Sequence, residues 1–252
     1  SRSRCSSPSA VPHVATATGW PATDWVEDLV LRRAGPEIYD DWAAGRLSWQ
    51  APEIRIAFEE FETHVLDGER SIGGLRSVLQ TDVSRASEPL FADPPGCALY
   101  KQASFAEDWL PAGVTVGAGQ DVDTFVLPGT EPDMAPIVTS GDAAVQFEQR
   151  PNVDRLMDFL ASPDGGEAWA DAGGFVSALS SVDITSYFGD VDAGFARVLL
   201  DDRASRFDAS DVLPADVGSG LLWRRITSWI EGTLTLDELL TSIDAALGIE
   251  SG

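Results

Sequence analysis

Short amphipathic runs separated by Gly and Pro fill the first third of the chain, a pattern that predicts consecutive helices. Asp24 followed by Glu27 has the spacing of a capping box, so we expect a helix to open there and to cover WVEDLVLRRA at 25–34. The Gly-Pro pair that follows should end it. A second short helix is expected over PEIYDDWAAG at 36–45.

Two more helices are expected before residue 80. Pro52 suits the first position of a helix over 52–66, and SIGGLRSVL at 71–79 predicts a fourth helix. Four apolar residues of the third helix approximate one face: Ile56, Phe58, Phe61 and Val65.

The middle of the chain changes to strand character and the last part returns to helices. Residues 97–105, 121–129 and 143–147 are rich in strand formers and are bounded by turn residues. After a turn at 210–214, the final helix should open on a capping box formed by Thr235 and Glu238. The helices expected in this part cover 151–162, 163–173, 192–202, 220–232 and 235–247. The chain is therefore predicted to be α/β.

Composition restricts the partners. The 252 residues are 44% hydrophobic, enough for one large domain or two small ones, and their formal net charge is −24. Phosphate backbones would be repelled, so nucleic acid is excluded as a partner. The acids are spread along the chain, which favours a solvated surface over an acidic binding patch.

Motifs of the common enzyme classes are absent from the sequence. It contains no G-x-x-x-x-G-K-[ST], G-x-S-x-G or H-E-x-x-H, and GAGQDV at 117–122 lacks the third glycine of a dinucleotide fingerprint. His13 and His64 have no metal-ligand spacing. We therefore expect no cofactor, no metal and no catalytic residue.

Eight tryptophans are the unusual feature that remains. Sugar rings stack their C–H faces on indole, while their hydroxyls need carboxylates and amides, so Trp beside Asp suits carbohydrate binding. The same tryptophans would also serve as ordinary core residues. The two cysteines, Cys5 and Cys97, leave open one disulfide or two buried thiols.

Four long strings, at 18–42, 90–105, 140–178 and 206–223, resemble the extracellular solute-binding proteins of family 1, which serve carbohydrate ABC importers. They are most similar to the α-glucoside binders. They run TGWPATDWVEDLVLRRAGPEIYDDW, LFADPPGCALYKQASF, SGDAAVQFEQRPNVDRLMDFLASPDGGEAWADAGGFVSA and RFDASDVLPADVGSGLLW.

The resemblance implies a periplasmic-binding-protein-like type II fold with two lobes, here without most of the N-terminal lobe. Residues 1–130 would be the first part of the C-terminal lobe, and 131–180 would return to the N-terminal lobe. Residues 181–252 would then be helices that pack on the C-terminal lobe.

The function implied by the resemblance is non-catalytic capture of an α-glucoside or other oligosaccharide and its delivery to a membrane permease. The protein would act as a monomer, extracellular or periplasmic, and the full-length chain would be anchored as a lipoprotein. Trp-rich clefts also occur in glycoside-processing enzymes and carbohydrate-binding modules, which stay as the alternative. A third possibility is that this portion alone binds nothing.

Six residues are the candidate ligand contacts. Trp20, placed by Pro21 at the edge of a lobe, would stack on the sugar, and Asp24 would accept sugar hydroxyls or only cap its helix. Gln102 would hydrogen-bond hydroxyls, unless its neighbour Lys101 faces the cleft instead. The family resemblance adds Gly141, Asp142 and Phe175 from the other lobe. It also leaves a Cys5–Cys97 disulfide as a possible link.

Overall fold

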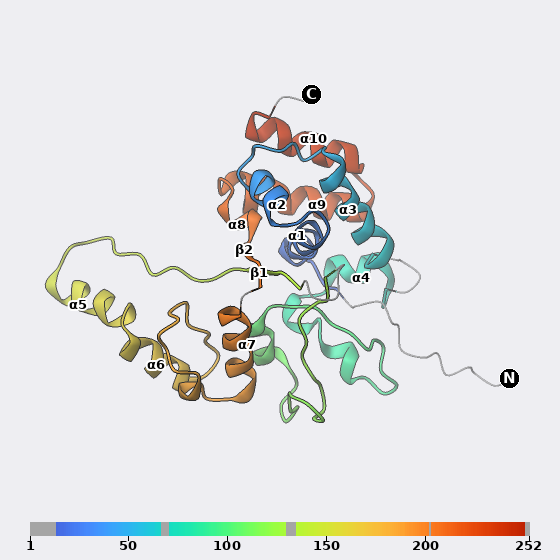
Figure 1. The fold of residues 1–252 in the computed structure, drawn as a ribbon. Helices are drawn as coiled ribbons and strands as arrows, with labels where there is room; N and C mark the ends of the chain where they lie inside the picture. Colours follow the sequence, from blue (N-terminus) through green and yellow to red (C-terminus); the bar gives the residue numbers. More distant parts are fainter. Residues whose placement is uncertain (1–13, 67–70, 130–134, 202, 250–252) are drawn as a thin grey trace. The chain divides into compact units, whose positions relative to one another are not determined.

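The computed structural model describes residues 14–66, 71–129, 135–201 and 203–249 (Figure 1). The chain forms two compact units. The first unit comprises the residues up to Gln102, Leu127–Ser140 and the residues from Ala204 onward, and the second comprises Ala103–Val126 and Gly141–Arg203. The predicted lobe boundaries, at 130 and 180, do not coincide with these limits, and the assignment of units to lobes stays a prediction.

The first unit is mainly helical. Its longer helices are α1 (Trp20–Ala34), α2 (Pro36–Ala43), α3 (Pro52–His64), α4 (Gly74–Gln80), α9 (Trp223–Glu231) and α10 (Leu236–Leu247). Shorter elements are 3-10 turns at Val83–Arg85 and Glu88–Phe91, α8 (Ala209–Val212), a π-helical stretch at Asp216–Leu222, and the strands β1 (Ile137–Thr139) and β2 (Ser205–Phe207). All six predicted helices of this unit are confirmed.

Helix α1 begins five residues earlier than the capping box predicted. Gly19 precedes the helix with φ 96°, and Pro21 stands in the first turn, where its fixed φ fits and its missing N–H costs nothing. Gly19 also lies close to α9, because a Cβ there would meet the Trp223 carbonyl oxygen at 2.6 Å. Asp24 is therefore in the second turn, and the prediction that it caps the helix was wrong.

Aromatic side chains form the core of this unit around α1. Figure 1 shows α1 next to α2, α3 and α9. The rings of Trp42 and Trp49 lie 4.7 Å apart, and Phe58 of α3 meets Trp229 of α9 at 5.7 Å. The predicted face of α3 was wrong at Ile56, which is 46% exposed, because the helical repeat instead buries Ile54, Ala57, Phe58 and Phe61.

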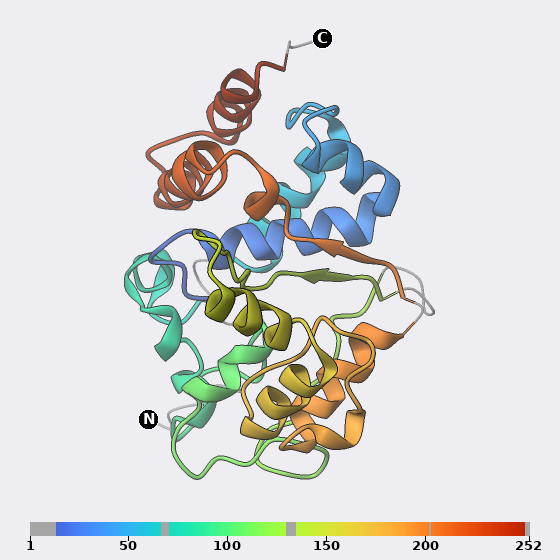
Figure 2. The same cartoon turned by 90° about the vertical axis from the view of Figure 1, so that its left-hand side faces the viewer.

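The sheet of the first unit has two strands. β1 and β2 pair in parallel with Ile137 opposite Ser205, and α1 lies against β1 (Figure 2). The strands predicted at 97–105, 121–129 and 143–147 do not form among the described residues, where only isolated bridge positions occur nearby, at Cys97, at Tyr100 and between Val116 and Val122. A strand needs a neighbour to accept its hydrogen bonds, which side-chain pattern alone does not reveal.

The second unit consists of short helices and long connections. Its elements are 3-10 turns at Ser104–Trp109 and Ile184–Ser186, α5 (Pro151–Leu160), α6 (Pro163–Ala172) and α7 (Asp190–Leu200). The three predicted helices are confirmed, and α5 and α6 each begin at a proline, as expected. In none of the described helices are the length and the apolarity sufficient to cross a bilayer.

Candidate functional site

Helix α1 places several polar side chains on one side. Trp20, Asp24 and Asp28 are four residues apart, so they share a face of the helix. Trp20 and Asp24 are half-buried and Asp28 is buried. Trp20 is thus neither a core residue nor fully open, and its indole stands one turn from a carboxyl group.

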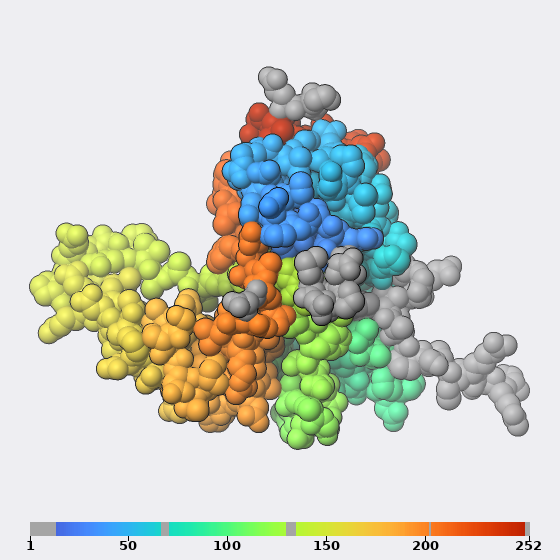
Figure 3. All heavy atoms as spheres, in the orientation of Figure 1, coloured from blue at the N-terminus to red at the C-terminus, as the bar shows by residue number. Residues whose placement is uncertain are grey.

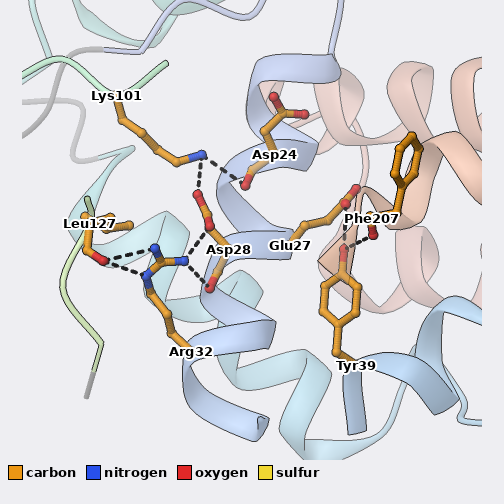
Figure 4. Close-up of polar contacts among 8 residues, drawn as sticks. All are labelled: Asp24, Glu27, Asp28, Arg32, Tyr39, Lys101, Leu127 and Phe207. Atoms are coloured by element: carbon orange, nitrogen blue, oxygen red, sulfur yellow. Dashed lines mark hydrogen bonds and ion pairs between the residues drawn. The ribbon is translucent and has the colours of Figure 1, made fainter. Parts of the chain in front are cut away.

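Lys101 contacts this face from a distant part of the chain (Figure 4). Its Nζ lies 2.6 Å from Asp28 Oδ2 and donates to the backbone carbonyl of Asp24 at 3.2 Å. The ammonium also lies 5.1 Å from the centre of the Trp25 ring, a cation–π contact. Lys101 is therefore held against α1, where its ammonium pairs with the Asp28 carboxylate and bonds the backbone of Asp24.

Arg32 continues the charged row one turn further along α1. Its guanidinium bonds the Asp28 carboxylate and donates to the Leu127 carbonyl at 3.0 Å (Figure 4). Asp28 therefore stands between two cations. The row fixes both Lys101 and the chain at Leu127 to the helix.

Asp24 has an unusual electrostatic environment. Burial raises its pKa from 3.8 to about 8, because Lys101 only partly offsets the desolvation and the nearby Asp208 and Asp28 add repulsion. Its side chain also hydrogen-bonds to that of Asp208. At neutral pH the carboxyl group can therefore donate as well as accept a hydrogen bond.

Glu27, on the neighbouring face of α1, has a structural position. Burial raises its pKa well above 4.5. Its oxygens accept hydrogen bonds from the N–H groups of Ala209 at 2.6 Å and Ser210 at 3.1 Å, and from the Tyr39 hydroxyl at 3.1 Å. The Phe207 carbonyl lies at the same distance from the Tyr39 hydroxyl and is the other acceptor for its single hydrogen (Figure 4). This carboxyl therefore attaches α1 to α2 and to the start of α8.

Gln102 is half-buried and its side chain hydrogen-bonds to Tyr100. Of the neighbours Lys101 and Gln102, it is Lys101 that contacts α1. The structure thus brings Trp20, Asp24 and Lys101 together on one helix face, and Gln102 belongs to the same unit.

The predicted residues of the second unit are arranged differently. Gly173 and Gly174, with φ 82° and 67°, end α6 and reverse the chain so that Phe175 returns over Trp169. The two rings stack with centroids 4.4 Å apart and planes 10° apart. Trp169 is 52% exposed and Phe175 is half-buried, so the pair presents an aromatic surface.

Gly141 and Asp142 lie in an exposed loop, and nothing lies within 4 Å of a Cβ built on Gly141. The strand expected to follow them is absent. Cys97 is buried in the first unit, whereas Cys5 lies outside the described residues, so their disulfide stays a prediction.

Sequence reasoning missed three features of these sites. The sequence pattern predicts a capping role for Glu27, indicates no role for Asp208, and does not show that Trp169 stacks on Phe175. The only signal for Trp169 was its place before a Gly-Gly pair. Within the described ranges, no group of three or more His, Cys, Asp or Glu side chains is arranged to hold a metal ion.

Two known proteins match nearly the whole chain in sequence. The chain is 32% identical over 237 residues to the alpha-glucosides-binding periplasmic protein AglE of Rhizobium meliloti, and the match covers 93% of this chain and 50% of that protein. It is 35% identical over 217 residues to the osmoprotective compounds-binding protein GgtB of Synechocystis, covering 86% and 51%. No family model matches.

Among solved structures, a chitin oligosaccharide binding protein superposes with a TM-score of 0.61 and 17% identity, over 95% of this chain and 60% of that one. The likeness confirms the predicted fold class. The α-glucosides-binding relative confirms the resemblance to sugar-binding periplasmic proteins. The chain spans about half the length of the curated relatives it matches.

Proposed function

We propose that this chain, which is homologous to periplasmic sugar-binding proteins, is part of the sugar-binding component of a carbohydrate ABC importer. Its ligand would be an α-glucoside or another oligosaccharide, and it would bind without catalysis. The observation that carries the proposal is the 32% identity to the α-glucosides-binding relative over 93% of the chain.

The first unit offers suitable groups for a sugar. Trp20 would stack on the apolar face of a ring, while Asp24 would bond a hydroxyl as donor or acceptor. Gln102 would add an amide of the kind that recognises hydroxyls. Lys101, which pairs with Asp28, would offset part of the negative charge near the bound sugar.

The second unit would contribute separately. Gly141 and Asp142 would supply an accessible backbone and a carboxylate, and Phe175 would supply an aromatic surface. Because Phe175 stacks on Trp169, we include Trp169 as part of the same aromatic contact. A sugar seated on the exposed indole would use the pair as one platform.

The second relative suggests another ligand class. Its name assigns it osmoprotective compounds, and it is 35% identical to this chain. A compatible solute with hydroxyl groups would use the same Trp and carboxyl chemistry. Binding rather than catalysis is supported by both relatives, since each is named as a binding protein.

The remaining parts of the proposal follow from the same homology. The protein would work outside the cytoplasm, as a monomer, and would deliver its ligand to a membrane permease. In the full-length protein we place a lipid anchor at the membrane. Neither nucleic acid nor a cofactor takes part.

Calorimetric titration with maltose, trehalose, sucrose and isomaltose tests the proposal. One of these sugars should bind saturably, and Trp20→Ala should weaken that binding about tenfold by removing one stacking contact. Trp109→Ala, which changes a half-buried tryptophan outside the proposed contacts, is the matched control. Equal loss in both variants would remove Trp20 from the site. Hydrolysis of an aryl glucoside, abolished by changing one carboxylate, would instead favour the enzyme alternative.

A further inference from the structure

Three carboxyl groups meet where α1 lies against the start of α8. Asp24 and Glu27 of α1 each hydrogen-bond through their side chains to Asp208, which is buried. In Figure 3 the segment of β2 and α8, in orange, lies beside the blue of the first helices. An ionised carboxylate can only accept a hydrogen bond, so each bonded pair of carboxyl groups needs one proton. The cluster therefore retains protons at a pH where isolated acids have lost theirs.

Asp208 is the fixed member of this cluster. Its backbone N–H donates to the Thr139 carbonyl of β1 at 2.8 Å. Its Oδ1 accepts from the Ser210 hydroxyl at 2.8 Å and from the Asp211 N–H at 3.1 Å, and so caps α8. Two donors to one carboxylate favour its charged form. Asp208 is therefore held in place as an acceptor, and Asp24 carries the proton of the pair that they form.

The charges around Asp24 also favour its protonated form. The titratable groups around it are Asp28 and Glu27 on α1, Tyr39 on α2, Lys101, and Asp208 before α8. Lys101 is the cation of this set, and its ammonium is paired with Asp28. Burial and the neighbouring acids therefore outweigh the cation, and the pKa of Asp24 is about 8.

We propose that Asp208 is a positioning residue of the sugar site: it accepts a hydrogen bond from protonated Asp24, and sugar affinity falls when Asp24 ionises. This role rests on the proposed function, in which Asp24 bonds a sugar hydroxyl. With its O–H directed to Asp208, Asp24 offers its other oxygen to the sugar at a fixed place. Ionisation would set two carboxylates against each other, so Asp24 would turn away from Asp208 and lose that place.

The pH range of the loss follows from the pKa of Asp24, about 8. Nearly all Asp24 side chains are protonated at about pH 6, and about one in ten is protonated at about pH 9. When only the protonated form binds, the apparent dissociation constant is the intrinsic one divided by the protonated fraction. The dissociation constant should therefore be about tenfold higher at about pH 9 than at about pH 6.

Calorimetric titration across this pH range tests the dependence. The ligand is whichever of maltose, trehalose, sucrose and isomaltose binds most tightly at about pH 6. In the variant Asp24→Asn the side chain cannot ionise, so the ratio of the dissociation constants at the two pH values should fall from about ten to about one.

The variant Asp208→Asn separates positioning from a structural role. Asparagine caps helices about as well as aspartate, so α8 should keep its start. The amide has no charge and can donate to an ionised Asp24, so the pH at which affinity falls should decrease by about one unit or more. Asp82→Asn is the matched control, because the exposed Asp82 caps a 3-10 turn of the same unit by accepting from Ser84. It should leave the pH profile unchanged.

The outcomes distinguish this role of Asp208 from the proposed function. Equal affinity across the pH range, affinity that rises with pH, or an unshifted profile in Asp208→Asn would overturn the role and leave sugar binding intact. Absence of binding at every pH would reject the proposed function, and the role would fall with it. If Asp208→Asn does not fold, carbon-13 NMR of the Asp24 carboxyl in the unchanged chain decides: titration near pH 8 supports the role, and titration near pH 4 overturns it.

Discussion

A carboxyl group in the centre of a helix can serve the fold or a ligand: on α1, Glu27 serves the fold, and Asp24 is the group we propose for the ligand. Glu27 is fully buried and accepts three hydrogen bonds. Asp24, one turn earlier, is half-buried and belongs to the face with Trp20. The sequence shows two acids with capping-box spacing, but it does not show which one faces the core, because the helix begins five residues earlier than this spacing predicts.

Removing Glu27 should therefore destabilise the first unit. Glu27→Ala removes the acceptor of the Ser210 N–H and one of the two partners of the Ala209 N–H and of the Tyr39 hydroxyl, so the free energy of unfolding should fall by about 3 kcal/mol. Urea denaturation measures the loss. Glu37→Ala, at an exposed acid of α2, should change it by less than about 0.5 kcal/mol. Similar small effects in both variants would contradict the structural role of Glu27.

Asp24 should make stability depend on pH. Its pKa is about 8 in the folded protein against an ordinary 3.8, so the folded state binds this proton more tightly. The free energy of unfolding should then decrease as the pH rises from about 4 to about 8. In the variant Asp24→Asn this side chain cannot ionise, so the free energy of unfolding should decrease less over the same pH range. The melting temperature measured at each pH reports the difference.

Part of the slope should remain in that variant, because burial also raises the pKa of Glu27. Asp208 and Asp28 add negative charge around Asp24, and Lys101 opposes it. Asp216→Asn, at an exposed acid, should leave the slope unchanged. An unchanged slope in Asp24→Asn would show that Asp24 is ionised normally.

At the scale of elements, the sequence predicts a feature correctly when all the residues that form it lie within a few positions of one another. The capping box of α10 is formed as predicted, with Thr235 and Glu238 bonding each other's backbone N–H groups. The predicted strands do not form because strand partners are set by the fold; the strands that do form, β1 and β2, pair residues 68 positions apart. Long-range contacts of this kind leave no mark in the local pattern.

A long-range bond also fixes α10. The buried Asp244 accepts from the Ser48 hydroxyl at 2.6 Å, the Trp49 N–H at 2.7 Å and the Gln50 amide at 2.9 Å. Asp244→Ala should therefore cost about 3 kcal/mol of unfolding free energy. Asp237→Ala, at an exposed position of the same helix, should cost less than about 1 kcal/mol by the same urea measurement. Equal costs would refute the attachment.

At the scale of the whole molecule, the resemblance predicted the fold class and the relatives, while composition predicted only a globular acidic protein. Residue roles were harder to predict. Trp20 and Asp24 do share a face, but Trp169 emerges as a partner of Phe175 only once the Gly-Gly turn is formed.

The most direct test of the central claim is a titration of intrinsic tryptophan fluorescence in this chain with maltose, trehalose, sucrose and isomaltose. Glycerol, a polyol without a ring, serves as the comparison. Sugar binding predicts a saturable change with at least one of the four sugars and none with glycerol, since stacking on Trp20 or Trp169 needs a ring face. A flat response to every sugar from a cooperatively folded sample would contradict the account.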